Sequence, residues 1–440
     1  MTRSIYSGLA VLAVVSLAAC SEAPVSPNDG PDAPETVVLS VNAGGAEQVM
    51  AGEIIVTLND GVSAAEVANA HGLRVGQSGY RNSFVIMHGN AGAERANANA
   101  LRGDRRVESA DPNFLRQPTV INPNLWAFYN PGGLNMNYSR GKSSGQPINS
   151  SYASITDADE DNIEGYAAGG ADVVIGSIDT GVDFSHSEFT GRLIAGRDWY
   201  NNDNDPSDDD GHGTHTSGTM AGETVGVAGV SGAAPHVRIY VQKVCGRRGC
   251  PSSAIASAIE AAADYPGMVA MNLSLGGASS TQAEINAVNY ATGKNVLVIA
   301  SAGNDGTGTV SCPACIASAM SVAATNWRDA LASYSNYGPG IDIAAPGGEC
   351  YSNTTPEGCI YSAYNGGGYA WLQGTSMAAP QVTGTAAIVA SKTGLRGAAL
   401  RSRIESNADD KGAPGYDTSF GNGRLNSYRA VTGSVLAFPQ

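Results

Sequence analysis

Three polar residues that border apolar segments could together support nucleophilic catalysis. Asp179 follows the apolar run DVVIGSI, His212 begins the small-residue segment HGTHTSGTMAG, and Ser376 begins the long stretch SMAAPQVTGTAAIVA. A serine hydroxyl is too weakly acidic to attack an amide unaided, so a histidine must accept its proton and a carboxylate must orient that histidine. These residues supply one group for each role, so the sequence predicts a serine nucleophile served by a histidine and an aspartate.

Each of these residues also has an ordinary alternative explanation. Asp179 could cap a turn, and Ser376 could cap the helix that follows it. His212 and His215 lie three positions apart on one predicted helix, so a zinc site is an alternative. The HExxH pattern of zinc peptidases needs four positions and an intervening glutamate, and neither is present. The GxSxG turn of the α/β-hydrolases is absent around Ser376, which weighs against that class.

The elements that must position these residues alternate along the chain. Apolar runs rich in β-branched residues predict strands within 172–178, 237–244, 267–275 and 295–304. Segments such as SAIASAIEAAADY and TQAEINAVNYATG predict helices between these strands. Strands that alternate with helices predict a parallel sheet covered on both faces. Active sites in such sheets gather at the carboxyl ends of strands, where Asp179 is expected.

Three blocks of the sequence resemble the signature motifs of the subtilisin-like serine peptidases, also called subtilases or peptidase family S8. They are SIDTGVD around Asp179, GHGTHTSG around His212 and GTSMAAP around Ser376. The resemblance runs from about residue 120 to the end of the chain. It implies a three-layer α/β fold with a parallel central sheet, and a serine endopeptidase that needs no catalytic cofactor. In that mechanism Ser376 forms the acyl-enzyme, His212 is the general base and then acid, and Asp179 orients it.

The same resemblance assigns further site residues. Asn304 in SAGN matches the oxyanion-hole asparagine, whose amide would donate to the developing oxyanion alongside the N–H of Ser376. Ser274, Leu275 and Gly276 in SLGG match the backbone strip that pairs with an extended substrate and walls the first specificity pocket. Main-chain pairing supplies affinity whatever the side chains are, so protein and peptide substrates of broad sequence are expected.

The sequence before the peptidase domain, which is expected over 118–440, divides into three parts. Residues 1–20 have the layout of an export signal, and their final LAAC resembles a bacterial lipobox in which Cys20 would carry the lipid. Residues 21–51 are rich in Pro, Ser and acidic residues and predict a flexible linker. Residues 52–117 predict a small α+β domain.

The order of elements within 52–117 resembles the ferredoxin-like, inhibitor I9-type propeptides of subtilisins. A self-processing zymogen inhibited by its own propeptide is therefore expected, with the cut within NFLRQPTVINPNLW. Trp126 in that segment resembles the aromatic residue near mature N-termini. A permanent regulatory or docking domain is the alternative reading of 52–117.

The net charge of the chain and its export signal indicate which partners and which location to expect. A formal net charge of −15 argues against nucleic acid as a partner, because phosphate binding needs clustered Lys and Arg. The signal predicts an exported bacterial lipoprotein, either anchored at the membrane through Cys20 or released after maturation. We expect it to act as a monomer.

Besides Cys20, six cysteines form three close pairs. The pairs are Cys245 with Cys250, Cys312 with Cys315, and Cys350 with Cys359. An exported chain would oxidise them to local disulfides. The alternatives are a four-thiolate zinc site made by the first two pairs and a redox-active CxxC at the second.

The acidic loop RDWYNNDNDPSDDDGH precedes His212. Asp198, Asp203 and Asp205 match a calcium motif found in some relatives, and Asp208 is a weaker candidate. A solvated loop without metal is the alternative. For the whole chain, the competing functions are a catalytically silent, peptide-binding lipoprotein with the subtilase fold, and an esterase.

Overall fold

The computed structural model describes residues 49–118, 169–230, 233–326, 329–350 and 358–433. The predicted export signal, Cys20, most of the predicted linker and Trp126 lie outside these described residues. Within the described part of the chain, no helix combines the length and apolar character that crossing a membrane requires.

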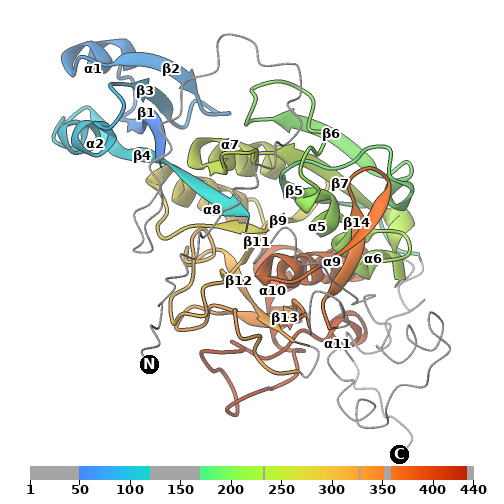
Figure 1. Ribbon diagram of the computed structural model, residues 1–440. Coiled ribbons are helices and arrows are strands. Elements are labelled where there is room, and N and C mark those ends of the chain that lie inside the picture. The colour runs from blue at the N-terminus through green and yellow to red at the C-terminus, as the bar shows by residue number, and fades with distance from the viewer. Residues whose placement is uncertain (1–48, 119–168, 231–232, 327–328, 351–357, 434–440) are drawn as a thin grey trace, which may run out of the picture. The chain divides into compact units, whose positions relative to one another are not determined.

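A seven-stranded parallel sheet occupies the centre of the larger domain (Figure 1). Its order is β13-β12-β11-β9-β5-β7-β6. The strands are β5 (Val173–Asp179), β6 (Leu193–Asp198), β7 (Val237–Lys243), β9 (Met268–Leu273), β11 (Leu297–Ser301), β12 (Met320–Thr325) and β13 (Ile343–Pro346). All seven residues of β5 are buried, as expected for a strand covered on both faces. The predicted parallel α/β architecture is confirmed.

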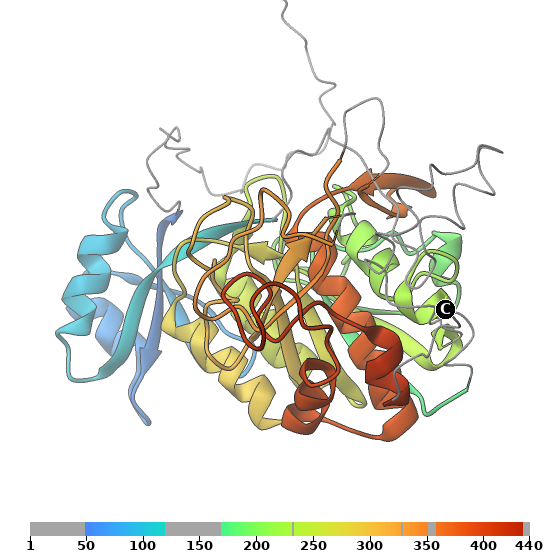
Figure 2. The same ribbon diagram turned by 90° about the horizontal axis from the view of Figure 1, so that it is seen from below.

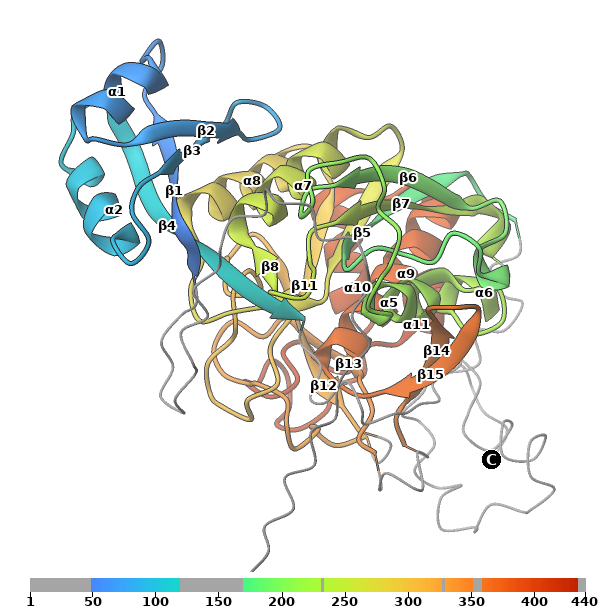
Figure 3. The ribbon, with the colours of Figure 1, turned by 45° about the horizontal axis from the view of Figure 1, so that its top comes forward.

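Helices cover both faces of this sheet. On one face lie α5 (His212–Ala221) and α9 (Thr375–Thr393), and on the other lie α7 (Ser252–Asp264) and α8 (Gln282–Gly293) (Figures 1 and 3). Alternate residues of β5 divide between the two layers, because successive side chains of a strand point to opposite faces. Val173 and Ile175 join the core beneath α9, whereas Val174 and Ile178 join the core beneath α7 and α8.

Small residues allow α5 and α9 to be buried all round. Every residue of α5 is buried, and α9 is buried from Thr375 to Ser391. A Cβ on Gly384 of α9 would lie 2.5 Å from the carbonyl oxygen of Met220 in α5, so only glycine permits this approach. The helix α5, which begins at His212, and the helix α9, whose second residue is Ser376, are therefore held against each other.

Shorter elements complete the domain. They are η2 (Ser187–Phe189), α6 (Val227–Val230), η3 (Ala234–His236), β8 (Cys250–Pro251), β10 (Leu275–Gly276), the antiparallel pair β14 (Ile360–Tyr364) and β15 (Gly368–Leu372), α10 (Gly397–Glu405) and α11 (Ser427–Thr432). The pair β14 and β15 lies immediately before the turn that leads into α9.

The N-terminal domain has its own core and an antiparallel sheet. Its elements are β1 (Val49–Leu58), α1 (Ala64–Ala70), β2 (Arg74–Ser78), β3 (Val85–His88), α2 (Glu94–Arg102) and β4 (Val107–Pro118). The strand β2 is an addition to the three strands and two helices that the sequence predicts here, and the bounds differ from 52–117. The first strand begins at Val49, which pairs with Phe114, and β4 extends to Pro118, which pairs with Leu275. Figures 2 and 3 show β4 leaving this domain and passing along the larger one.

Candidate active site

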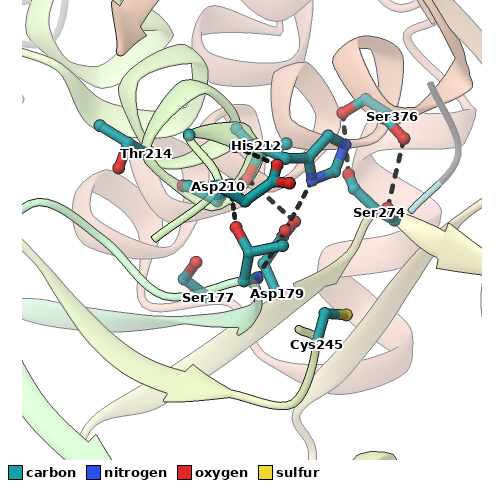
Figure 4. Close-up of polar contacts among 12 residues, drawn as sticks. Ser177, Asp179, Asp210, His212, Thr214, Cys245, Ser274 and Ser376 are labelled. Atoms are coloured by element: carbon teal, nitrogen blue, oxygen red, sulfur yellow. Dashed lines mark hydrogen bonds and ion pairs between the residues drawn. The ribbon is translucent and has the colours of Figure 1, made fainter. Parts of the chain in front are cut away.

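A buried pair formed by Asp179 and His212 lies where β5 ends and α5 begins (Figure 4). Asp179 Oδ1 is 2.6 Å from His212 Nδ1, and the side chains are only 1% and 2% exposed. Asp179 also accepts hydrogen bonds from the N–H of Thr180 at 2.7 Å and the hydroxyl of Thr216 at 3.2 Å. A carboxylate at Nδ1 makes that nitrogen the donor, so Nε2 carries the lone pair that can accept a proton.

The environment of His212 favours its protonated form. Burial of the ring lowers its pKa, but the charge of Asp179 and the hydrogen bond from Nδ1 outweigh burial, so the pKa of His212 is raised above 6.5. The imidazolium that a proton transfer would create is therefore stabilised where it forms.

Ser376 is the second residue of α9 and is fully buried. Its Oγ donates to the carbonyl oxygen of Ser274 at 3.2 Å, and the hydroxyl of Ser274 donates to the carbonyl oxygen of Ser376 at 2.8 Å. Within the described part of the chain, the buried Nε2 of His212 has no hydrogen-bond partner. Figure 4 shows the imidazole edge facing Ser376. The structure thus brings the three predicted residues together.

Asn304 lies beside the start of α9. Its Oδ1 accepts hydrogen bonds from the N–H and the hydroxyl of Thr375, at 2.8 and 2.9 Å. Thr375 precedes Ser376, so these two bonds hold the amide next to the nucleophile candidate. Because Oδ1 faces Thr375, the Nδ2 donor of Asn304 is presented on its other side.

The substrate-binding backbone strip predicted from SLGG lies next to Ser376. Leu275 and Gly276 form β10, which pairs antiparallel with Pro118 and Gln117 of β4. The carbonyl of Ser274, next along the strip, accepts the Ser376 hydroxyl. An extended chain therefore already lies along this strip and leads toward Ser376.

The N-terminus of α5 is anchored by Asp208, a role that the sequence analysis missed. Gly211 is the N-cap with φ 111°, a conformation that favours glycine, and it has no side chain to accept hydrogen bonds. Asp208, 8% exposed, accepts instead from the N–H groups of Gly211 and Thr214 at 3.0 and 2.9 Å and from the Thr180 hydroxyl at 2.9 Å. Its carboxylate thus faces the start of the histidine helix.

The other predicted calcium ligands are also engaged within their loop. Asp198 accepts two hydrogen bonds from Asn201, both 2.8 Å, and Asp203 accepts one from the N–H of Asp205. Nowhere in the described ranges do three or more His, Cys, Asp or Glu side chains gather in a way that could hold a metal ion. The four carboxylates therefore do not form a preassembled cage.

The zinc alternatives are wrong. His215 Nε2 lies 3.2 Å from the carbonyl oxygens of Ile360 and Ala370, so it donates to the β14–β15 pair and is not directed at a shared metal with His212. Burial, with the charge of His212, lowers the pKa of His215 to about 3. The cysteines form the three predicted disulfides, Cys245–Cys250, Cys312–Cys315 and Cys350–Cys359.

Comparison with known proteins decides the family. Residues 170–423, more than half of the chain, match the family model described as "Subtilase family". The chain belongs to the subtilase family. A second model, described as "Open reading frame 2 N-terminal domain", matches residues 33–117 of this subtilase, so the family model found for this segment is not an I9 inhibitor.

Curated relatives of this subtilase are serine proteases. It is 37% identical over 413 residues to "Thermophilic serine proteinase" of Bacillus sp. (strain AK1), covering 92% of this chain and 93% of that protein. It is 38% identical over 265 residues to thermitase of Thermoactinomyces vulgaris, covering 60% of this chain and 90% of thermitase. The subtilase described here is accordingly a subtilisin-like serine protease, as predicted.

Solved structures agree with this assignment. A lanthipeptide protease matches with a TM-score of 0.54 and 28% identity, over 60% of this chain and 88% of that one. Fervidolysin from Fervidobacterium pennivorans, described as a keratinolytic enzyme related to subtilisin, matches with a TM-score of 0.66 over 90% of this chain and 63% of that one. At 24% identity, fervidolysin supports the fold alone.

Asp208→Ala tests the anchoring of α5. Removing a buried carboxylate that accepts from two helix N–H groups should destabilise the protein by about 2 kcal/mol or more and lower turnover, because His212 is the first residue of that helix. Thermal unfolding and kcat are measured in chelator. The control is Asp205→Ala, an exposed carboxylate bonded within its own turn to Ser207, which should have a much smaller effect. Equal effects of the two substitutions would contradict the anchoring role.

Proposed function

We propose that this subtilase is a self-processing serine endopeptidase in which Ser376 is the nucleophile, His212 the general base and acid, and Asp179 the orienting carboxylate. The observation that carries the proposal is the buried 2.6 Å pair of Asp179 and His212, with Nε2 directed at Ser376. His212 Nε2 takes the hydroxyl proton as Oγ attacks the substrate carbonyl, and returns it to the leaving amine. Water then attacks the acyl-enzyme by the same route in reverse.

The charge that develops on the substrate oxygen needs donors fixed in advance. We assign this role to the N–H of Ser376 and the Nδ2 of Asn304, both at the start of α9, where the helix dipole also favours negative charge. The catalytically silent alternative is disfavoured because the base, the nucleophile and these donors are all present together. The esterase alternative is disfavoured by the substrate strip, which suits an extended peptide.

The strip formed by Ser274, Leu275 and Gly276 is proposed to bind substrates through main-chain hydrogen bonds. The N-terminal domain already uses β10 in this way, since β4 pairs with it antiparallel. Recognition through the backbone is insensitive to side-chain identity, so protein and peptide substrates of broad sequence are expected.

The N-terminal domain is proposed to be an inhibitory propeptide because it occupies this strip and also completes two helices of the protease domain. Pro251, the N-cap of α7, has no acceptor side chain, and the fully buried Asn113 accepts from the N–H of Ser253 at 3.1 Å. Asp111 likewise accepts from the N–H of Gln282 at the start of α8, at 3.1 Å. These bonds favour folding with the propeptide in place.

The strand register indicates where the propeptide would be cut. Pro118, the last described residue of β4, lies opposite Leu275, and the preceding residue of the strip, Ser274, has the carbonyl that accepts the Ser376 hydroxyl. We therefore propose the bond between Thr119 and Val120, which lies outside the described residues, as the scissile bond.

Ser376→Ala tests self-processing. Wild-type protein made without other proteases should yield a product whose N-terminus is Val120, and Ser376→Ala should keep its propeptide, because no nucleophile remains. Intact mass gives both answers. Normal maturation of the variant would refute self-processing, and a wild-type N-terminus several residues from Val120 would refute the register argument.

The raised pKa of His212 predicts how activity falls on the acidic side of the pH profile, called here the acidic limb. The base must be neutral, so kcat/KM should be retained above the pKa of His212, which lies above 6.5, and be lost as pH falls through it. Asp179→Asn should move this limb to lower pH because the charge that raises the pKa is lost, and it should reduce kcat by about 10⁴-fold because the asparagine amide can donate to Nδ1 and hold the wrong tautomer. In pH profiles, the control Asp210→Asn, which removes a weaker charge influence on His212, should move the limb less. An unmoved limb in Asp179→Asn would contradict the assigned pair.

We also propose Ca²⁺ as a structural ion of the acidic loop, outside the catalytic chemistry. Six carboxylates lie within residues 198–210, and the ammonium of the buried Lys243 bonds to only one of them, Asp209. A divalent cation would relieve their mutual repulsion. Asp198, Asp203 and Asp205 are not gathered around one point in the structure, so the proposal requires the loop to close around the cation for them to be its protein ligands. The midpoint of thermal unfolding should fall in chelator and recover with Ca²⁺, and Asp203→Asn should weaken that response. A midpoint that does not respond to chelator would overturn the calcium proposal.

Export as a lipoprotein through Cys20 and action as a monomer remain proposals from the sequence. The lipoprotein proposal rests on the LAAC segment and on the cysteine count, since the other six cysteines form the three disulfides.

A further inference from the structure

The first turns of α9 contain a proline at a position where the helix needs a donor. In an α-helix, the N–H of residue i donates to the carbonyl of residue i−4, so residue 380 would serve the carbonyl of Ser376. Residue 380 is a proline within α9, and it has no N–H. Its ring also crowds the carbonyl four residues earlier, which turns that carbonyl outward from the helix. The carbonyl of Ser376, the nucleophile candidate, therefore receives no hydrogen bond from the residue four positions later in its helix.

The side chain of Ser274 supplies the missing donor. Its hydroxyl donates to the Ser376 carbonyl at 2.8 Å, and Ser274 is fully buried, so water does not compete for this carbonyl. The amide of Asn272, also fully buried, donates from Nδ2 to Ser274 Oγ at 2.9 Å. Because Oγ accepts from Asn272, its single hydrogen is directed at Ser376.

We propose that the Ser274 hydroxyl, oriented by Asn272, is a positioning group that replaces the N–H absent from Pro380 and so fixes the nucleophile's peptide unit. This rests on the proposed role of Ser376. The carbonyl, the N–H and Oγ of Ser376 belong to one residue, so a rotation of its peptide unit moves both the nucleophile and an oxyanion donor. Small misplacements of reacting groups lower the rate of the chemical step more than they weaken binding. The role is separate from the backbone of Ser274, which faces the substrate.

Ser274→Ala keeps the substrate-binding backbone and removes only this hydroxyl. We expect kcat to fall about five- to tenfold, the effect of one neutral hydrogen bond, with KM within about twofold of wild type. Reaction with a fluorophosphonate counts the competent sites, so that kcat refers to folded enzyme. If Ser274→Ala does not fold, the near-isosteric Ser274→Cys, whose S–H is a weak donor, takes its place with the same expectation. An unchanged kcat would overturn the proposal.

Pro380→Ala provides the decisive comparison because it restores the helix's own N–H donor to the Ser376 carbonyl. In the Pro380→Ala background, Ser274→Ala should change kcat by less than about twofold, so the two substitutions should be strongly non-additive. Equal losses in both backgrounds would mean that Ser274 does not stand in for the missing donor, and would overturn the proposal.

A matched control lies at the other end of the same helix. Ser391 Oγ donates to the carbonyl of Ala171 at 2.6 Å, so Ser391→Ala removes a similar bond from α9. It should lower stability but leave kcat at the wild-type value, and a kcat loss like that of Ser274→Ala would overturn the positioning role. Wild-type enzyme that hydrolyses peptides but does not lose activity to the fluorophosphonate would instead contradict the role of Ser376 itself.

Discussion

The buried contact between Asp179 and His212 is the constraint on which the rest of the site depends. An isolated carboxylate in a protein interior is costly, so Asp179 can be 1% exposed only because its oxygens accept from His212, Thr180 and Thr216. That contact joins the carboxyl end of a central strand to the first residue of a helix. Everything that fixes the end of β5 or the start of α5 therefore also fixes the imidazole.

The starts of α5, α7 and α9 organise the remainder of the site, and none of these three has a side-chain hydrogen bond from its own N-cap residue. Asp208 accepts from α5 in the preceding loop, Asn113 accepts from α7 in the N-terminal domain, and Ser274, between β9 and β10, donates to the Ser376 carbonyl in the first turn of α9. Each arrangement ties a helix start to a separate element. This gives more positional control than local caps would, because the helix cannot shift without breaking a tertiary contact.

The strip at 274–276 links the proposed inhibition to the proposed binding of substrate. Leu275 and Gly276 pair with β4 in the structure, and the same backbone groups are proposed to pair with substrate. β4 also carries Asn113 and Asp111. The strand that occupies the strip therefore also accepts hydrogen bonds from N–H groups at the starts of α7 and α8.

Local pattern in the sequence determined the parallel α/β fold and the three disulfides, because each depends on a run of residues or a close spacing. Short motifs also selected Asp179, His212, Ser376 and, through the family resemblance, Asn304 as the candidate site residues. Only the tertiary structure decided that Asp208 accepts from the start of α5, that His215 donates to β14 and β15, and that β4 continues across the expected boundary to meet Leu275. It alone also showed that the Ser274 hydroxyl donates to the Ser376 carbonyl, four residues before Pro380. The physical reason is that most of these contacts join residues more than a hundred positions apart, and a side chain's hydrogen-bond partner is set by what packs against it.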